Sequence, residues 1–201
     1  MDNEKLLMIF TKNPEAGKVK TRLARDLGNN KALEIYKFLL KHSHEITAPL
    51  KLEKQVFYSS FLAENDIWET GGFEKKLQID GDLGDKMQAA FTDAFAQGYQ
   101  EVIIIGSDLY DISSADISAA FSELQDHDYV IGPAKDGGYY LLGMKAMNKK
   151  LFHGKNWSTS SVFEDSLKDM QDAKIKVLPE KNDIDMLDDI KDHPAFQNFI
   201  K

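Results

Sequence analysis

Cysteine is absent from this 201-residue chain, which excludes disulfides, thiolate metal ligands and a cysteine nucleophile. Long apolar runs are missing too, since none approaches the ~18 residues that a membrane-spanning helix needs. The N-terminal MDNEKLLMIFT places acidic residues before a short apolar run and has no small-residue cleavage site, so we expect no signal peptide. These absences favour a reducing compartment and predict a cytoplasmic protein without a membrane span.

Positive charge is scarce and unevenly placed. The net charge of -8 argues against nucleic-acid binding, because that mode needs clustered cations facing the phosphate backbone. The chain's two arginines, Arg22 and Arg25, stand in one short basic segment together with Lys12, Lys18 and Lys20. Such a concentration of cations in an acidic protein predicts a local site for an anion.

The composition is that of an ordinary globular protein, with 42% hydrophobic and 29% charged residues. The length fits the range of roughly 100–200 residues for one domain, and no repeat, low-complexity tract or linker interrupts the chain. Short apolar runs alternate with amphipathic segments, which is typical of an α/β protein with crossover connections. We therefore expect one α/β domain over residues 1–201.

The basic segment follows the first predicted strand, residues 5–11. A helix starting near Lys18 and ending before Gly28 would stack Lys18, Arg22 and Arg25 on one face, and its N-terminus would favour anions. We expect phosphate binding here, against the simpler reading of a solvated helix face. Walker A spacing is excluded because Lys12 and Val19 stand where glycine and Ser or Thr are required, and no GxGxxG occurs.

Acidic residues follow a second buried strand, residues 102–105. Asp108 comes directly after it and Asp111 three residues later, while Asp183 and Asp185 lie in an acidic segment near the end of the chain. Ligands of open α/β sheets bind at the carboxyl ends of the strands, where a carboxylate can hold a metal or a hydroxyl group. Asp111 can equally be a turn or helix-start residue, and the late pair an ordinary acidic loop.

Asp136 precedes Gly137 and Gly138, a turn signal consistent with a simple hairpin. Paired glycines also allow a backbone to approach a ligand closely, and the acid beside them could bind a sugar hydroxyl or act as a general base. Trp157 is expected in the core or as a lid over the pocket, with Ser158 or Thr159 capping the next helix. No HExxH or GxSxG motif is present, so no chemistry is assigned to the histidines.

Six ordered motifs resemble those of a bacterial family of glycosyltransferase-like proteins, formerly a domain of unknown function (DUF2064-like). These have the GT-A, or nucleotide-diphospho-sugar transferase, fold. The resemblance covers nearly the whole chain and implies a three-layer α/β/α architecture with a mixed, mostly parallel, Rossmann-like sheet. The motifs are FTKNPEAGKVKTRLA, GDLGDKM, IGSDLYD, GPAKDGGYYLLG, the WST at 157–159 and NDIDMLDD.

The resemblance also implies roles for individual residues. Lys12, Lys20 and Arg22 would contact a diphosphate, and Asp108 would hold a divalent metal, Mg²⁺ or Mn²⁺. Either Asp183 or Asp185 would be a second acidic contact; we expect Asp185 at the metal and Asp183 in the substrate pocket.

Asp136, with Gly137 and Gly138, would line the sugar or acceptor side, with Asp111 and Trp157 also expected in the pocket. The chain departs from the family pattern after the strand, because Leu109 and Tyr110 replace the usual Cys-Pro, and Asp108 is followed by Asp111 rather than forming a DxD motif.

The leading functional hypothesis is metal-dependent transfer from a nucleoside-diphosphate sugar to an unidentified acceptor, with Asp136 as the general base that activates the acceptor hydroxyl. The alternative is nucleotidyl transfer, because the KTRLA segment also resembles the start of phospholactate guanylyltransferases, although the GxGxR opening of nucleotidyltransferases is absent. A catalytically silent nucleotide-binding domain is a third reading. The expected partner is a small-molecule nucleotide or nucleotide sugar, and the sequence indicates no oligomeric state.

Overall fold

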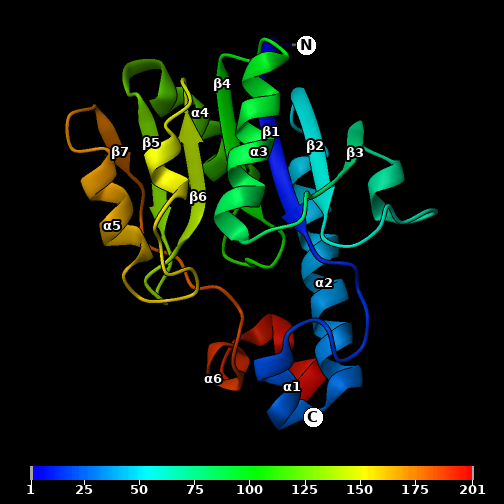
Figure 1. Cartoon of the computed structure of the whole chain (residues 1–201). Helices are drawn as coiled ribbons and strands as arrows, with labels where there is room; N and C mark the ends of the chain where they lie inside the picture. The colour runs from blue at the N-terminus through cyan, green and yellow to red at the C-terminus, as the bar shows by residue number, and fades with distance from the viewer. Residues whose placement is uncertain (1, 201) are drawn as a thin grey trace.

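The protein is described by a computed structural model that covers residues 2–200 and contains a seven-stranded sheet in the order β3-β2-β1-β4-β6-β5-β7 (Figure 1). The strand β6 is antiparallel to both of its neighbours, and the other pairings are parallel. The predicted mixed, mostly parallel sheet is confirmed. Its strands are β1 (Asp2–Thr11), β2 (Leu52–Tyr58), β3 (Phe73–Leu77), β4 (Glu101–Gly106), β5 (Tyr129–Pro133), β6 (Tyr139–Met144) and β7 (Ile175–Val177).

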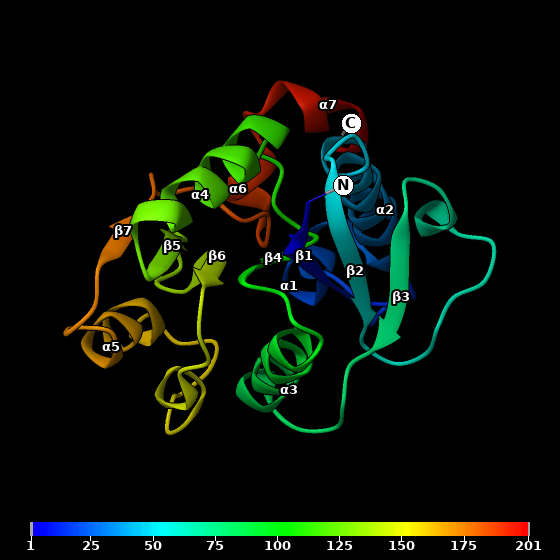
Figure 2. The same ribbon diagram turned by 90° about the horizontal axis from the view of Figure 1, so that it is seen from above.

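Helices cover both faces of the sheet, as the α/β/α prediction required. In the view of Figure 2, α2 and α4 lie on one side of the strands, and α3 and α5 lie on the other. Among residues 2–200, no helix is long and apolar enough to cross a bilayer. The α-helices are α1 (Thr21–Leu27), α2 (Asn29–Thr47), α3 (Leu83–Ala96), α4 (Ser114–Asp126), α5 (Val162–Asp169), α6 (Leu187–Ile190) and α7 (Gln197–Ile200), and the 3-10 helices are η1 (Ile67–Glu69), η2 (Lys149–Phe152) and η3 (Pro194–Phe196).

The central strands are buried on both faces because consecutive side chains point to opposite sides of a sheet. On β1, Leu6 and Met8 enter the core beneath α3, whereas Leu7 and Ile9 enter the core beneath α2 and α4. The four apolar residues 102–105 of β4 divide between the two cores in the same way. This double burial explains why both strands read as continuous apolar runs.

The parallel register brings several loops to one edge of the sheet. Phe10 of β1 lies opposite Gly106 of β4, and Thr11 lies opposite Tyr58 of β2. The chain therefore leaves β1, β2 and β4 at the same edge, and the directions of β5 and β6 place their connecting turn, residues 134–138, there as well. This carboxyl edge is where open α/β sheets bind ligands.

The C-terminal segment lies against α1 and α2 below this edge (Figure 1). A third apolar cluster joins them, and its buried members are Leu23, Ile35, Leu39, Ile184, Ile190 and Phe196. Because Ile184 is anchored in this cluster, its neighbours Asp183 and Asp185 are carried to the carboxyl edge, far from their position in the sequence. Both predicted late acids thus reach the region of the basic segment.

Three local expectations differ from the structure. The first helix begins at Thr21, because Lys20 has a left-handed backbone (φ 47°) that cannot continue a right-handed helix. Residues 76–79 indicate a strand by sequence, whereas β3 spans Phe73–Leu77 and so begins and ends earlier. The helix α5 is preceded by Ser161 without a side-chain cap, so the expected cap at Ser158 or Thr159 is wrong. By contrast, the spacing of Ser113 and Asp116 predicts a capping box at the start of α4, and that capping box is present.

Candidate functional site

Three adjoining cavities open at the carboxyl edge, and Asp108 and Ser158 line all of them. The basic cavity, about 220 Å³, is lined by Lys12, Lys18, Lys20 and Arg22. The central cavity, about 400 Å³, includes Gln78 and Lys86. The acidic cavity, about 180 Å³, includes Asp136, Tyr139, Trp157 and Asp183. Asp108 therefore stands where surfaces of different charge meet.

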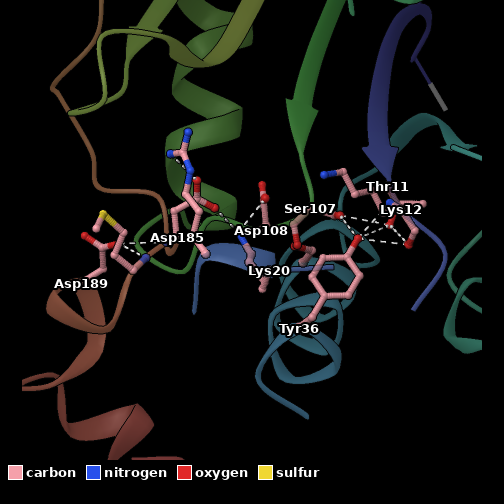
Figure 3. A network of polar contacts seen from close by, with 11 residues as sticks. Thr11, Lys12, Lys20, Tyr36, Ser107, Asp108, Asp185 and Asp189 are labelled. Carbon is pink, nitrogen blue, oxygen red and sulfur yellow. Dashed lines mark hydrogen bonds and ion pairs between the residues drawn. The ribbon is translucent and has the colours of Figure 1, made fainter. Parts of the chain in front are cut away.

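Lys20 joins the basic segment to the acidic residues. Its Nζ lies 2.8 Å from Oδ2 of Asp108 and 3.2 Å from Oδ1 of Asp185 (Figure 3). The Lys20 side chain is only 3% exposed, whereas that of Asp108 is 44% exposed. Arg22 extends the cluster, with Nη1 3.3 Å from Oδ2 of Asp185. Three segments distant in sequence, residues 20–22, 108 and 185, are thus held together by charge.

The two charges of this pair stabilise one another. Burial acts to lower the pKa of the Lys20 ammonium, but Asp108 and Asp185 outweigh it and raise that pKa above its ordinary value. Burial likewise acts to raise the pKa of the Asp108 carboxyl, and Lys20 outweighs it and holds that pKa below its ordinary value. Both groups are therefore charged at neutral pH.

A network of hydroxyl groups fixes the backbone beside this pair (Figure 3). The Tyr36 hydroxyl accepts a hydrogen bond from the Lys12 N–H at 2.8 Å and lies 3.1 Å from the Lys12 carbonyl oxygen, to which it can donate. Ser107 Oγ donates to Thr11 Oγ1 at 3.0 Å. Because Ser107 directly precedes Asp108, the network sets the distance between the first loop and the strand-tip carboxylate.

The acidic cavity brings carboxylates close to one another. Burial, and then the charge of Asp136, raise the pKa of Asp183 to about 6, with further contributions from Asp108 and Asp185. Asp136 itself is exposed, and its Oδ1 accepts a hydrogen bond from the Gly138 N–H at 2.8 Å, which shapes the β5–β6 turn. The predicted acids Asp136 and Asp183 thus share one wall of the site with Asp108.

The segment 157–161 closes the site because two glycines let it approach. Gly137 has a φ of +88°, and a Cβ added there would lie 2.3 Å from the carbonyl oxygen of Ser160. A Cβ added at Gly84, in the first turn of α3, would lie 2.7 Å from Nε1 of Trp157. Trp157 consequently packs against the start of α3 while it lines the acidic cavity, so it lies in the predicted pocket.

Not every predicted residue reaches the cavities. Lys18 lies outside α1 and pairs with Glu15 at 2.7 Å, so the expected helical stacking with Arg22 and Arg25 is wrong, although Lys18 does line the basic cavity. Arg25 is exposed and does not line any of the three cavities. Asp111 is exposed as well, and only its carbonyl oxygen is engaged, by Lys181 Nζ at 2.7 Å.

The polar residues of the central cavity that sequence reasoning missed include Tyr36, Gln78, Lys86 and Ser107. Tyr36 lies among the apolar positions Ala32, Ile35 and Leu39 of one helical stripe, so its spacing indicates a core position and not a polar role. Lys86 belongs to the GDLGDKM motif, whose two glycines indicate a turn before a helix and assign no role to the lysine. Ser107 stands next to Asp108, so its position after an apolar run was the one available signal.

The donor set fits a hard divalent cation. Within residues 2–200, no three His, Cys, Asp or Glu side chains are arranged to hold a metal ion by themselves. Magnesium commonly takes only one or two protein carboxylates and completes its shell with substrate phosphates and water. Asp183 lines the same cavity as Asp108 and Asp136, and burial together with the charge of Asp136 raises its pKa to about 6. Asp185, by contrast, is already engaged by Lys20 and Arg22.

The fold and the carboxyl-edge site define the class: this is the fold of nucleotide-diphospho-sugar transferases. The family described as "Uncharacterized protein conserved in bacteria (DUF2064)" matches residues 44–159, more than half of the chain, and the chain belongs to this family. The predicted family resemblance is thereby confirmed. Among curated proteins, none matches the chain.

Solved structures agree with this assignment. A protein of Desulfovibrio desulfuricans G20, described as a "putative nucleotide-diphospho-sugar transferase", is 31% identical with a TM-score of 0.87, over 98% of this chain and 89% of its own. A cytidylyltransferase of Leptospira borgpetersenii is 13% identical with a TM-score of 0.62, over 93% of this chain and 83% of its own.

Rv0371c of Mycobacterium tuberculosis H37Rv, solved in complex with manganese, is 9% identical with a TM-score of 0.54, over 94% of this chain and 97% of its own. At these low identities, the Leptospira borgpetersenii and Mycobacterium tuberculosis structures show a shared fold alone.

Proposed function

We propose that this protein is a transferase that binds a nucleotide at the carboxyl edge of its sheet and transfers a glycosyl group from a nucleoside-diphosphate sugar to an acceptor. The single observation that carries the proposal is the meeting of the basic and acidic cavities at Asp108. A diphosphate needs cations, and a reacting hydroxyl needs a carboxylate. Both are offered here within one continuous site.

The basic cavity receives the diphosphate in this proposal. Lys12, Lys18 and Arg22 provide cationic donors at its rim, and Lys20 provides a buried ammonium. Arginine binds phosphate oxygens through two parallel N–H groups, whereas lysine acts as a point charge. As the bond between the anomeric carbon and the diphosphate oxygen breaks, the leaving group gains negative charge, and these side chains stabilise it.

The acidic cavity receives the sugar and the acceptor. The acceptor oxygen forms the new bond to the anomeric carbon, and its proton passes to a carboxylate. Asp136 is the predicted base, and its exposed position on the β5–β6 turn supports that role. Tyr139 and Trp157 supply apolar and aromatic surface on the wall of this cavity, suited to the face of a sugar ring.

A divalent cation, Mg²⁺ or Mn²⁺, would be held by Asp108 together with substrate phosphate oxygens. Asp183 is the better-placed second carboxylate, because Lys20 and Arg22 already pair with Asp185. The cation would supply charge neutralisation at the diphosphate. The manganese of the Mycobacterium tuberculosis structure with the same fold supports this proposal.

Nucleotidyl transfer is the second candidate. Its support is the shared fold of the Leptospira borgpetersenii cytidylyltransferase, together with a basic cavity that would equally suit a departing pyrophosphate. In that reaction a phosphorylated acceptor attacks the α-phosphorus of a nucleoside triphosphate, and pyrophosphate leaves.

A thermal-shift panel tests the proposal. Nucleoside diphosphates, diphosphate sugars and triphosphates are each added with and without Mn²⁺, because a ligand that binds only the folded state raises the Tm. Stabilisation by one diphosphate and its sugars supports glycosyl transfer, and stabilisation by a triphosphate alone supports nucleotidyl transfer. Asp108→Asn should remove the Mn²⁺ dependence. If no nucleotide raises the Tm of the native protein, the proposal fails.

A further inference from the structure

The side-chain amide of Gln78 is fixed in one orientation at the wall of the central cavity. Its Nε2 donates to the Phe57 carbonyl oxygen at 3.0 Å and to the Thr11 carbonyl oxygen at 3.4 Å. The flipped amide would set Oε1 against two carbonyl oxygens, so this assignment is determined by the hydrogen bonds. Oε1 remains without a hydrogen-bond partner among the described residues. Gln78 therefore offers a hydrogen-bond acceptor to a ligand in the central cavity.

Lys86 offers the same cavity a cation. It lies in the first turn of α3, is partly buried, and has no ion-pair partner within residues 2–200. The lysines of the neighbouring strand β3 behave differently, since Lys76 pairs with Asp93 at 2.7 Å and Lys75 with Asp66 at 2.8 Å. A lysine ammonium carries three donors, and hydrogen-bond acceptors on a ligand in the cavity would engage them.

The phosphate groups of a bound nucleotide would occupy the basic cavity and not the central cavity. The basic cavity contributes Lys18, Lys20 and Arg22, none of which lines the central cavity. Lys12 and Asp108 line both cavities, so a nucleotide that spans them would put its phosphates in the first and its base in the second. Phe10 and Leu83 supply apolar surface in the central cavity against which a planar ring can pack.

The Gln78 acceptor and the Lys86 ammonium on the wall of the central cavity would favour some nucleobases over others. Guanine and cytosine carry both N–H donors and a carbonyl oxygen, and uracil has an N–H between two carbonyl oxygens. Adenine has donors on its exocyclic amine but only ring nitrogens as acceptors. A carbonyl oxygen is the stronger partner for an ammonium group, so adenine leaves Lys86 the poorer contact.

We propose that Gln78 and Lys86 read the nucleobase, Gln78 by accepting a base N–H and Lys86 by donating to a base carbonyl, so that guanine, cytosine or uracil nucleotides are preferred over adenine nucleotides. This inference rests on the proposed function, since it assumes that a nucleotide occupies the site. It adds the chemical class of the base and two specificity-determining residues.

Isothermal titration calorimetry with ADP, GDP, CDP and UDP in Mg²⁺ tests this on the full chain. At least one of GDP, CDP and UDP should bind roughly tenfold or more tighter than ADP, the size expected for one hydrogen bond to a charged group. Lys86→Met should remove the tighter binding of that nucleotide relative to ADP, while the Kd of ADP should change by no more than about twofold. Lys86→Arg keeps the positive charge and should retain the preference. Lys150→Met, at an exposed lysine away from the three cavities, should behave as the native protein.

The outcomes separate the two proposals. Equal weakening of all four nucleotides by Lys86→Met would assign Lys86 to the phosphates and overturn the inference, as would preference of the native protein for ADP. If the native protein bound none of the four nucleotides, both this inference and the proposed function would be overturned. Gln78→Met is a second variant that should also reduce the discrimination against ADP. Its Tm checks that the amide is not needed for folding alone.

Discussion

The Lys20 ammonium lies 2.8 Å from the Asp108 carboxylate, although the two residues are 88 positions apart in the sequence (Figure 3). This ion pair connects the basic side of the site to its acidic side. The same Nζ also contacts Asp185, 165 residues away. The first loop, the central strand and the C-terminal segment are therefore linked through one buried side chain. Its charge serves both the geometry of the site and the proposed binding of phosphate.

Lys20→Met should weaken binding of a nucleoside diphosphate by roughly 10- to 100-fold, the loss expected from one to two hydrogen bonds to charged groups. It should also lower stability, because Asp108 and Asp185 lose their shared partner. Calorimetry and urea unfolding measure the two effects. Lys18→Met is the control for stability alone, since Lys18 is 69% exposed and its ion-pair partner among the described residues is Glu15, and its stability change should stay near 0–1 kcal/mol. An equal loss of stability from the two substitutions would contradict the role given to Lys20.

Tyr36→Phe removes the hydroxyl that contacts both backbone groups of Lys12. The Lys12 N–H donates to that hydroxyl at 2.8 Å, so the substitution leaves a donor without its partner and should cost about 1–3 kcal/mol of unfolding free energy. Urea unfolding measures the loss. Tyr140→Phe is a suitable comparison, because the Tyr140 hydroxyl makes a single bond, to the Pro179 carbonyl oxygen at 3.1 Å. Only Tyr36→Phe should also weaken nucleotide binding, since only it loosens the first loop.

The order of strands and helices was predictable because the relevant signals are local. Burial of side chains leaves a periodic pattern in the sequence. The apolar run at 102–105 and the apolar stripe of α3 are such patterns, and the stripe includes Met87, Ala90, Phe91 and Ala94. Asp108, after such a strand, could be placed by the general rule for open sheets. The start of α1 could not, because a left-handed conformation at Lys20 leaves no mark when the residue is not glycine.

The partners of the site residues were not predictable for a different reason. Tyr36 meets Ser107 and Lys20 meets Asp108 only after the sheet and the C-terminal segment have assembled. The sequence left the second acidic contact open between Asp183 and Asp185, and we expected Asp185 at the metal and Asp183 in the substrate pocket. The structure separates them, since Asp185 faces Lys20 and Arg22 while Asp183 lines the acidic cavity beside Asp136.

Gly137→Ala should be strongly destabilising. The residue has a φ of +88°, and the new Cβ would meet the backbone of Ser160 at 2.3–2.6 Å, where no flexible side chain can give way. Backbone strain contributes about 1 kcal/mol, and overpacking adds about 1–3 kcal/mol. Gly154→Ala separates these two effects, because Gly154 also has a positive φ (+67°) but has no atom within 4 Å of the added Cβ. Thermal unfolding of both variants should show a clearly larger loss for Gly137→Ala.

Asp183→Asn should change how stability depends on pH. The pKa of Asp183 rises from 3.8 to about 6 in the folded protein, chiefly because of burial and the charge of Asp136. The folded state therefore holds this proton more tightly than the unfolded state, and its contribution to stability is lost as the pH rises from about 4 through 6. That loss is on the order of 1–3 kcal/mol. The asparagine variant carries no such proton, so it should gain stability relative to the native protein as the pH increases across this range.

Urea unfolding between pH 4 and 7.5, with EDTA present to remove divalent metal, measures this difference. The carboxyl groups of Asp108 and Asp116 have lowered pKa values and act in the opposite direction, but they are present in both proteins and largely cancel in the comparison. Asp188→Asn is the control, because that side chain is 79% exposed, and its profile should follow that of the native protein. Parallel profiles for Asp183→Asn and the native protein would show that Asp183 is already ionised at pH 4, and that the carboxylates of the acidic cavity do not repel one another as the structure indicates.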